Sequence, residues 1–325
     1  MKNKILLTIF LFFFFNGIVW SQLLLRISHV VKNNSPKGRA VVYFKKIVEK
    51  ESKGAIKIEI YPEGILFDDR EALVALKKGL IQFAVPSFSK FADIVPEFQI
   101  YDIPYLFKNI QHVHRSYFGK IGSLLRNKSY EKGYVLLAMW DNGFKVFTNN
   151  KKRIKYPQDL KGLKIRTQGS KVINKSLEIV DAVPVTKPFR IVVDLLKAGL
   201  IDGQQNTYNN IYTQQFFRYQ KYLTITNNGF LGYAFISSVR FWKELNLKTK
   251  KIILDALEKA TIYEYKLAEK INFDDYYRII LHSNIQIIPL TDKEKKVWEN
   301  FYYKHYNVFY EFVDKKIVDE VFRLE

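Results

Sequence analysis

The order of hydrophobic and polar residues along the chain predicts strands and helices in alternation. Residues 23–30 are rich in aliphatic residues and residues 56–61 alternate apolar with charged positions, as half-buried strands do. Residues 38–53 and 69–78 place apolar residues on one side of a helix, and residues 82–86 form a further strand. Strands separated by helices in this way predict an α/β fold with a mostly parallel sheet.

A second series of the same kind follows. It comprises predicted strands over 134–140, 145–148, 164–167 and 184–186, and predicted helices over 107–130, 170–179 and 191–200. Residues 223–238 are extended and are broken by Asn227-Asn228-Gly229, so this segment is long enough to pass between two lobes.

Helical patterns dominate the C-terminal part of the chain. Residues 247–281 predict one long helix. The last 30 residues carry aromatic and apolar residues at a spacing of three to four, namely Trp298, Phe301, Tyr302, His305, Val308, Phe309 and Phe312. This spacing predicts a helical segment that covers a face of the core, and no cofactor is implied.

The N-terminal residues have the pattern of a secretory signal peptide. Lys2 and Lys4 precede an apolar run from Ile5 to Phe15, and Val19-Trp20-Ser21 is an acceptable cleavage site. We predict a signal peptide over residues 1–21, cleaved after Ser21, and a mature protein in the periplasm. The alternative is an uncleaved anchor, although 16 residues from Ile5 to Trp20 are short for a bilayer.

Composition narrows the classes of protein and of site. The 325 residues are 48% hydrophobic, which excludes a mostly disordered chain. The sequence includes no cysteine, which excludes disulfides, thiolate metal sites and cysteine nucleophiles. The formal net charge of +20 attracts anions of any size, from dicarboxylates to nucleic acid, and does not select among them.

Motifs for metal, nucleotide and nucleic-acid chemistry are absent from the sequence. His112 and His114 are two residues apart, so they point to different sides of a helix and do not form a zinc site. No phosphate-binding glycine loop or hydrolase elbow is present, and the basic runs lack interleaved aromatic residues. The acidic doublets Asp68-Asp69 and Asp274-Asp275 fit helix ends or solvated faces. We expect no catalysis, no cofactor, no metal and no nucleic-acid partner.

Several ordered stretches together resemble one family. They are Ser28-His29-Val30, Ser35-Pro36-Lys37-Gly38, Pro86 to Phe91, Asp102 to Phe107, Trp140 to Lys145, Gly162 to Ser170, Asp202 to Asn206 and Asn210 to Gln214. In this order and spacing, the chain resembles the solute-binding proteins of tripartite ATP-independent periplasmic (TRAP) transporters, specifically the DctP-type C4-dicarboxylate-binding branch.

The resemblance implies a fold and a function. It implies a two-lobed periplasmic binding protein with mixed, mostly parallel sheets, strands that cross between the lobes and a long C-terminal helix. We predict one lobe from residues 22–143 plus 231–272 and the other from 144–230 plus 273–325. The implied function is capture of a C4-dicarboxylate such as succinate, fumarate or malate by lobe closure, followed by delivery to TRAP membrane permease subunits.

Other readings remain open at this point. The ligand of the same transporter class can be another carboxylated solute, such as a sugar acid, a keto acid or an aromatic acid, because one arginine reads only one carboxylate. From a different class, a basic periplasmic enzyme or a polyanion-binding protein remains an alternative.

The predicted ligand site centres on Arg166. This arginine lies at the end of a predicted strand just before a helix, and a guanidinium offers two parallel N–H groups to a carboxylate. The resemblance implies that Arg166 binds the ligand carboxylate and that Asn206 binds the same carboxylate. The alternatives are an ion pair with a surface acid for Arg166 and a helix cap for Asn206. Lys145 is the predicted partner of the second carboxylate.

Five further residues complete the predicted ligand set. Ser89, His29 and Asn142 are candidates to bind ligand oxygens, Gln168 belongs to the stretch that contains Arg166, and Trp140 is a candidate apolar wall. For His29 the alternative is an ordinary core histidine. The chain also has Gln205 where the family usually has glutamate, and Thr207-Tyr208 in place of two prolines, which affects either the ligand set or a hinge contact.

Overall fold

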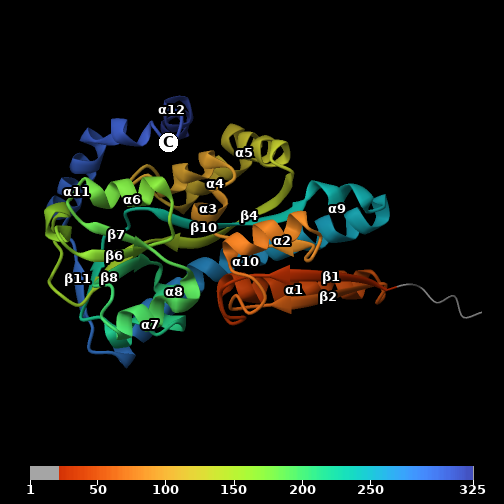
Figure 1. Cartoon of the computed structure of the whole chain (residues 1–325), viewed down its shortest axis with the longest axis horizontal. Helices are drawn as coiled ribbons and strands as arrows, with labels where there is room; N and C mark the ends of the chain where they lie inside the picture. Colours follow the sequence, from red (N-terminus) through yellow and green to blue (C-terminus); the bar gives the residue numbers. More distant parts are fainter. Residues whose placement is uncertain (1–21, 325) are drawn as a thin grey trace, which may run out of the picture.

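The computed structural model describes residues 22–324 and contains two β-sheets (Figure 1). The first sheet has the strand order β2-β1-β3-β10-β4. Its strands are β1 (Leu23–Ser28), β2 (Ile56–Tyr61), β3 (Phe83–Ala84), β4 (Tyr134–Phe144) and β10 (Phe230–Ser238). β1 runs parallel to β2 and β3, whereas β10 runs antiparallel to β3 and β4.

The second sheet has the order β11-β9-β5-β8-β6-β7. Its strands are β5 (Val146–Asn149), β6 (Lys164–Thr167), β7 (Val183–Thr186), β8 (Gly203–Asn206), β9 (Tyr222–Ile225) and β11 (Gln286–Pro289). β6 is parallel to β7 and β8, and β5 is antiparallel to β8 and β9. The predicted mixture of parallel and antiparallel strands in two lobes is confirmed.

Helices cover both sheets and join them. The α-helices are α1 (Pro36–Glu51), α2 (Asp69–Lys77), α3 (Phe88–Phe91), α4 (Ile110–Phe118), α5 (Lys120–Glu131), α6 (Lys171–Glu178), α7 (Val192–Lys197), α8 (Tyr208–Thr213), α9 (Val239–Glu244), α10 (Leu247–His282), α11 (Asp292–Lys304) and α12 (Lys315–Phe322). The 3₁₀ helices are η1 (Pro96–Asp102), η2 (Pro157–Leu160), η3 (Phe189–Ile191), η4 (Phe216–Tyr219) and η5 (Tyr306–Phe309).

Local sequence explains where the helices next to the cavity begin. Asp68 accepts hydrogen bonds from the backbone N–H groups of Arg70 and Glu71. The Glu71 carboxylate in turn accepts from the backbone N–H of Asp68, and together these bonds form a capping box for α2. Ser170 caps α6 by accepting from the Ile173 N–H. The predicted single helix over 107–130 is instead two helices, because α4 ends and α5 begins at Gly119.

Three connections join the lobes. The backbone passes directly from β4 into β5, and β9 leads into β10 through the Asn227-Asn228-Gly229 break that the sequence predicted. The 36-residue helix α10 contacts α1 and β4 on the first sheet and α8 beside the second (Figure 1). The predicted crossing strands and long helix are therefore confirmed.

The C-terminal segment packs against both lobes. α11 contacts η2, whereas α12 contacts α5 and η1. Trp298, Tyr302 and Phe309 are buried in a core cluster that also includes residues of both sheets, as the aromatic spacing predicted. The exact lobe boundaries stay a prediction, and the predicted signal peptide lies outside the described residues. Among the described helices, none is both long and apolar enough to cross a bilayer.

Candidate functional site: a cationic cavity between the sheets

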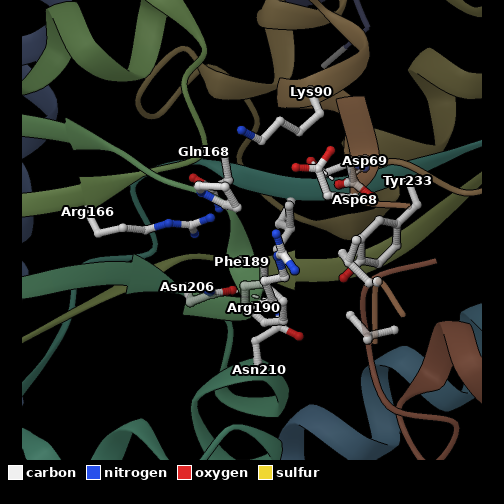
Figure 2. A pocket seen from close by; sticks show the side chains of 16 residues that line it. Asp68, Asp69, Lys90, Arg166, Gln168, Phe189, Arg190, Asn206, Asn210 and Tyr233 are labelled. Carbon is white, nitrogen blue, oxygen red and sulfur yellow. Dashed lines mark hydrogen bonds between the residues drawn. The ribbon is translucent and has the colours of Figure 1, made fainter. Parts of the chain in front are cut away.

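A cavity of about 530 Å³ lies where the carboxyl ends of strands from both sheets meet (Figure 2). The residues that line it are Val30, Val31, Gly64, Asp68, Asp69, Ser87, Lys90, Leu231 and Tyr233 from the first sheet and its connections, and Arg166, Gln168, Pro188, Phe189, Arg190, Asn206 and Asn210 from the second. The carboxyl ends of parallel strands are the usual place for ligand sites in α/β proteins.

Arg166 is held rigidly at the end of β6. Its Nε and Nη2 atoms donate to the backbone oxygen of Lys187 at 3.1 and 2.8 Å. The side chain is only 1% exposed, and burial lowers its pKa to about 10, so it remains a cation at neutral pH. Its Nη1 atom is buried and has no hydrogen-bond partner among the described residues. A buried cationic donor of this kind is suited to an anionic oxygen.

Asn206 presents a second unpaired donor. Its Oδ1 atom accepts from the backbone N–H of Thr207 at 3.1 Å and from Asn210 Nδ2 at 2.7 Å. Because both donors bind the oxygen, the amide NH₂ group is left on the other side, and Nδ2 is buried with no partner among residues 22–324. The cavity thus contains two donors suited to one carboxylate.

Lys90 brings a second buried cation into the same cavity from α3. It is 5% exposed, and Figure 2 shows its amino group and the Arg166 guanidinium both extending toward the centre of the view. Burial, together with the positive charges of Arg70 and Arg166, lowers the pKa of Lys90 to about 8. Lys90 is therefore mostly protonated at neutral pH and titrates just above it.

Two acidic residues, Asp68 and Asp69, line the cavity and moderate its positive charge, and Asp69 is the buried one. Asp69 Oδ2 accepts from the backbone N–H of Ser87 at 3.2 Å and from its hydroxyl at 3.3 Å. Burial raises the pKa of Asp69, although the nearby Lys37 opposes this shift. Asp69 therefore holds the Ser87 turn in place beside Lys90.

Aromatic rings form the walls. Tyr233 accepts a hydrogen bond from Asn142 Nδ2 at 2.7 Å, and the amino group of Lys37 lies 3.7 Å from the Tyr233 ring centroid. The Phe189 ring centroid lies 5.8 Å from Cζ of Arg166. These rings offer apolar surface to a carbon chain between two charged ends.

A family model for bacterial extracellular solute-binding proteins, family 7 (DctP), matches residues 27–312. The chain belongs to this family.

Characterised relatives of this DctP family member are similar over most of their length. The chain is 38% identical over 277 residues to the C4-dicarboxylate-binding protein DctB of Bacillus subtilis (strain 168). This match covers 85% of this chain and 79% of that protein. It is 34% identical over 278 residues to the C4-dicarboxylate-binding periplasmic protein DctP of Rhodobacter capsulatus, with 85% of this chain and 83% of the relative covered.

Solved structures of the family share the fold. A TRAP periplasmic solute-binding protein from Sulfurospirillum deleyianum, crystallised with bound succinate, matches with a TM-score of 0.91 and 35% identity. The match covers 94% of this chain and 100% of that one. The family resemblance and the two-lobed fold predicted from the sequence are both confirmed.

Three of the predicted site residues of this family member line the same cavity. Arg166, Asn206 and Gln168 come together there, and Gln168 Oε1 is also buried without a partner in the described part of the chain. Gln168 can use its amide to bind a polar ligand atom.

Lys145 has a different environment from the one predicted. Its amino group forms a buried ion pair with Asp102 Oδ1 at 2.9 Å, and Lys145 is not among the residues that line the cavity. Ser89 donates to the same Asp102 oxygen at 3.0 Å and likewise does not line the cavity. The pair joins η1 to the crossing strands, and the second buried cation that lines the cavity is Lys90.

The other three predicted residues do not line the cavity. Trp140 is buried in the core and donates to Thr261 Oγ1 at 2.8 Å, so it is no wall of the cavity. Asn142 contacts Tyr233 and lines a separate hollow beside α10. Both ring nitrogens of His29 are buried, and burial followed by the charge of Lys37 lowers its pKa to about 3.

Sequence reasoning missed Lys90, Asp69, Asn210, Tyr233 and Phe189. Lys90 and Asn210 lie inside stretches that carried the family resemblance, and Asp69 belongs to an acidic doublet. Only their places in the lining of the cavity that also contains Arg166 distinguish them, and these places depend on the folded chain. Within the described chain, no group of three or more histidine, aspartate or glutamate side chains is arranged to hold a metal ion.

The unusual Gln205 lies outside the cavity. Its Oε1 atom accepts from Asn228 Nδ2 at 3.5 Å, and Asn228 belongs to the break between β9 and β10. The position of Gln205 therefore favours an effect of the glutamate-to-glutamine replacement on the contact at the crossing strands over an effect on the ligand set.

Proposed function

We propose that this protein is the solute-binding subunit of a TRAP transporter, that it captures a C4-dicarboxylate in the periplasm, and that it delivers the ligand to membrane permease subunits without catalysing a reaction. The observation that carries the proposal is the pair of buried cations, Arg166 and Lys90, that line one cavity from different lobes. The names of the similar proteins, which bind C4-dicarboxylates, support the same ligand class.

The first carboxylate is proposed to bind at Arg166 and Asn206. Arg166 Nη1 and Asn206 Nδ2 are both buried donors without partners in the described chain. A buried cationic donor left unpaired is costly, so the free energy gained when a carboxylate binds includes relief of that cost. Because Arg166 is already fixed on the Lys187 carbonyl, little side-chain entropy is lost on binding.

The second carboxylate is proposed to bind Lys90. A monocarboxylate bound at Arg166 would leave the buried Lys90 ammonium without a ligand carboxylate, so that only Asp69 and Asp93 would offset its charge. A dicarboxylate satisfies both buried cations, and the aromatic rings of Tyr233 and Phe189 accept its short carbon chain. The ligand then contacts both lobes, which favours the form in which they are close together.

Isothermal titration calorimetry tests the ligand class. Succinate, fumarate and malate are compared with galactonate, 2-oxoglutarate and benzoate, which represent sugar acids, keto acids and aromatic acids. We expect tight binding of the C4-dicarboxylates alone. We expect the Arg166→Met variant to bind succinate at least about tenfold more weakly than the wild-type protein, since each charge-assisted bond contributes roughly 1.5–3 kcal/mol.

The matched control is Arg153→Met, because Arg153 is an exposed arginine that does not line the cavity. Tight binding of galactonate with no binding of succinate would replace the C4-dicarboxylate by a sugar acid. Equal binding of succinate by the wild-type protein and the Arg166→Met variant would remove Arg166 from the site.

A further inference from the structure

We infer that Gln99 is a positioning residue for the Arg166 end of the cavity, an inference that rests on the proposed function. Gln99 lies on η1 beside the first sheet and is buried. Its Oε1 atom accepts from the hydroxyl of Ser170 at 3.3 Å and from the backbone N–H of Val172 at 3.2 Å, both at the start of α6. One side chain of the first lobe thus binds the N-terminus of a helix in the second.

The bond to Val172 is one that α6 cannot make by itself. The first N–H groups of a helix have no partner within the helix. Ser170 accepts from Ile173, and Gln99 accepts from Val172, so a local residue and a distant one divide the donors between them. The positive end of the helix dipole strengthens a bond to an oxygen at this position.

The start of α6 is connected to the ligand site by a very short segment. β6 ends at Thr167, Gln168 lines the cavity, and Ser170 already caps the helix. Gly169 between them has a φ of 101°, and a Cβ placed on it would lie 2.6 Å from Thr186 Cγ2 and 3.0 Å from Arg70 Nη2. The connection from Thr167 to Ser170 is short and closely packed at Gly169, so a shift of the α6 N-terminus moves Gln168 and the end of β6.

Arg70 adds a second contact of the same kind. It pairs with Asp93 on the first lobe and lies against Gly169 of the second. Gln99 is nevertheless the residue whose hydrogen bonds cross between the lobes at this point, which makes it the residue to change. Gln99 is not among the residues that line the cavity, so it acts on ligand only through the segment from Arg166 to Ser170.

The test compares Gln99→Leu with Gln99→Glu, using succinate as the probe. Leucine removes the acceptor, and we expect about tenfold weaker binding caused mainly by faster dissociation. Glutamate keeps an oxygen in place and adds favourable charge at a helix N-terminus, so we expect it to retain wild-type affinity. Calorimetry gives the affinity, and stopped-flow fluorescence gives the rates.

A merely structural role predicts another result. It would lower the midpoint of thermal unfolding of the unliganded Gln99→Leu protein but leave its succinate affinity and dissociation rate unchanged, and that result would overturn the inference. If Gln99→Leu does not fold, Gln99→Glu alone decides, because loss of affinity in that variant contradicts a role for the oxygen.

A spin-label measurement separates failure of this inference from failure of the proposed function. The chain has no cysteine, so Lys78→Cys and Lys197→Cys, both at exposed positions in different lobes, give one labelled pair. In the unliganded protein we expect Gln99→Leu to broaden the distance distribution between the labels and Gln99→Glu to leave it narrow. An unchanged distribution in Gln99→Leu contradicts the inference even if succinate is not the ligand.

Discussion

Asn210 Nδ2 donates to Asn206 Oδ1 at 2.7 Å, and this bond leaves the amide nitrogen of Asn206 as the unpaired atom. The backbone N–H of Thr207 binds the same oxygen. Asn206 is therefore presented as a donor, which suits a carboxylate and not a ligand N–H group. The orientation arises from a residue four positions later, on the first turn of α8.

A double-mutant cycle tests this relationship. We expect Asn206→Ala and Asn210→Ala each to weaken succinate binding, with about fivefold for Asn210→Ala, because a neutral hydrogen bond contributes roughly 1 kcal/mol. In the Asn206→Ala background, Asn210→Ala is expected to have almost no further effect, since it acts through Asn206. Calorimetry on the four proteins measures the coupling. Additive losses would mean that Asn210 acts on ligand independently.

Part of this site could be predicted from the sequence. Arg166 was accessible because it lies at the end of β6, which has the bounds predicted from local order along the chain. Asn206 was accessible only through the family resemblance, because no strand was predicted over residues 203–206. Lys145 was predicted as a ligand because the sequence does not reveal its partner Asp102, which is 43 residues away. Lys90 was missed for the same reason, since its burial beside Arg166 depends on how the two lobes meet.

Lys90 is expected to determine the preference for two carboxylates. In the wild-type protein, succinate should bind much more tightly than butanoate, which has the same carbon chain but one carboxylate. A Lys90→Met variant keeps most of the apolar side chain and loses the charge, so it should lose about tenfold or more in succinate affinity and little in butanoate affinity. Calorimetry with both ligands measures the two ratios.

The corresponding control is Lys187→Met, because the Lys187 side chain is exposed and only its backbone oxygen contacts Arg166. If Lys90→Met retains the wild-type preference for succinate over butanoate, the second carboxylate binds elsewhere.

The low pKa of Lys90 predicts a pH dependence of binding. Burial, Arg70 and Arg166 lower this pKa to about 8, whereas Asp69 and Asp93 raise it. A carboxylate bound to Lys90 favours the protonated form, so succinate affinity should be constant below pH 8 and fall as the pH rises above it. Proton uptake on binding near pH 8.5 should appear as a dependence of the calorimetric enthalpy on the ionisation enthalpy of the buffer.

Lys37 is the alternative source of such a titration, because burial lowers its pKa to about 8 as well. The Lys90→Met variant separates the two groups. We expect the decline above pH 8 to vanish in this variant, and its persistence would assign the titration to Lys37.

Lys145 is expected to contribute to stability and not to affinity. Its ammonium is paired with Asp102 and both side chains are 1% exposed. Lys145→Met leaves a buried carboxylate without its cation, which typically costs 3–5 kcal/mol, so we expect a loss of about 3 kcal/mol in the free energy of unfolding. Chemical denaturation of the unliganded protein measures it.

In the same variant, succinate affinity should stay within about twofold of the wild-type value, because Lys145 does not line the cavity. A large loss of affinity with little change in stability would restore Lys145 to the ligand set in place of Lys90.

The most direct measurement is a crystal structure of the protein grown with succinate. One carboxylate should lie within hydrogen-bond distance of Arg166 Nη1 and Asn206 Nδ2, and the other within hydrogen-bond distance of the Lys90 amino group. Succinate bound outside this cavity, or bound in it with neither carboxylate on Arg166, would contradict the account.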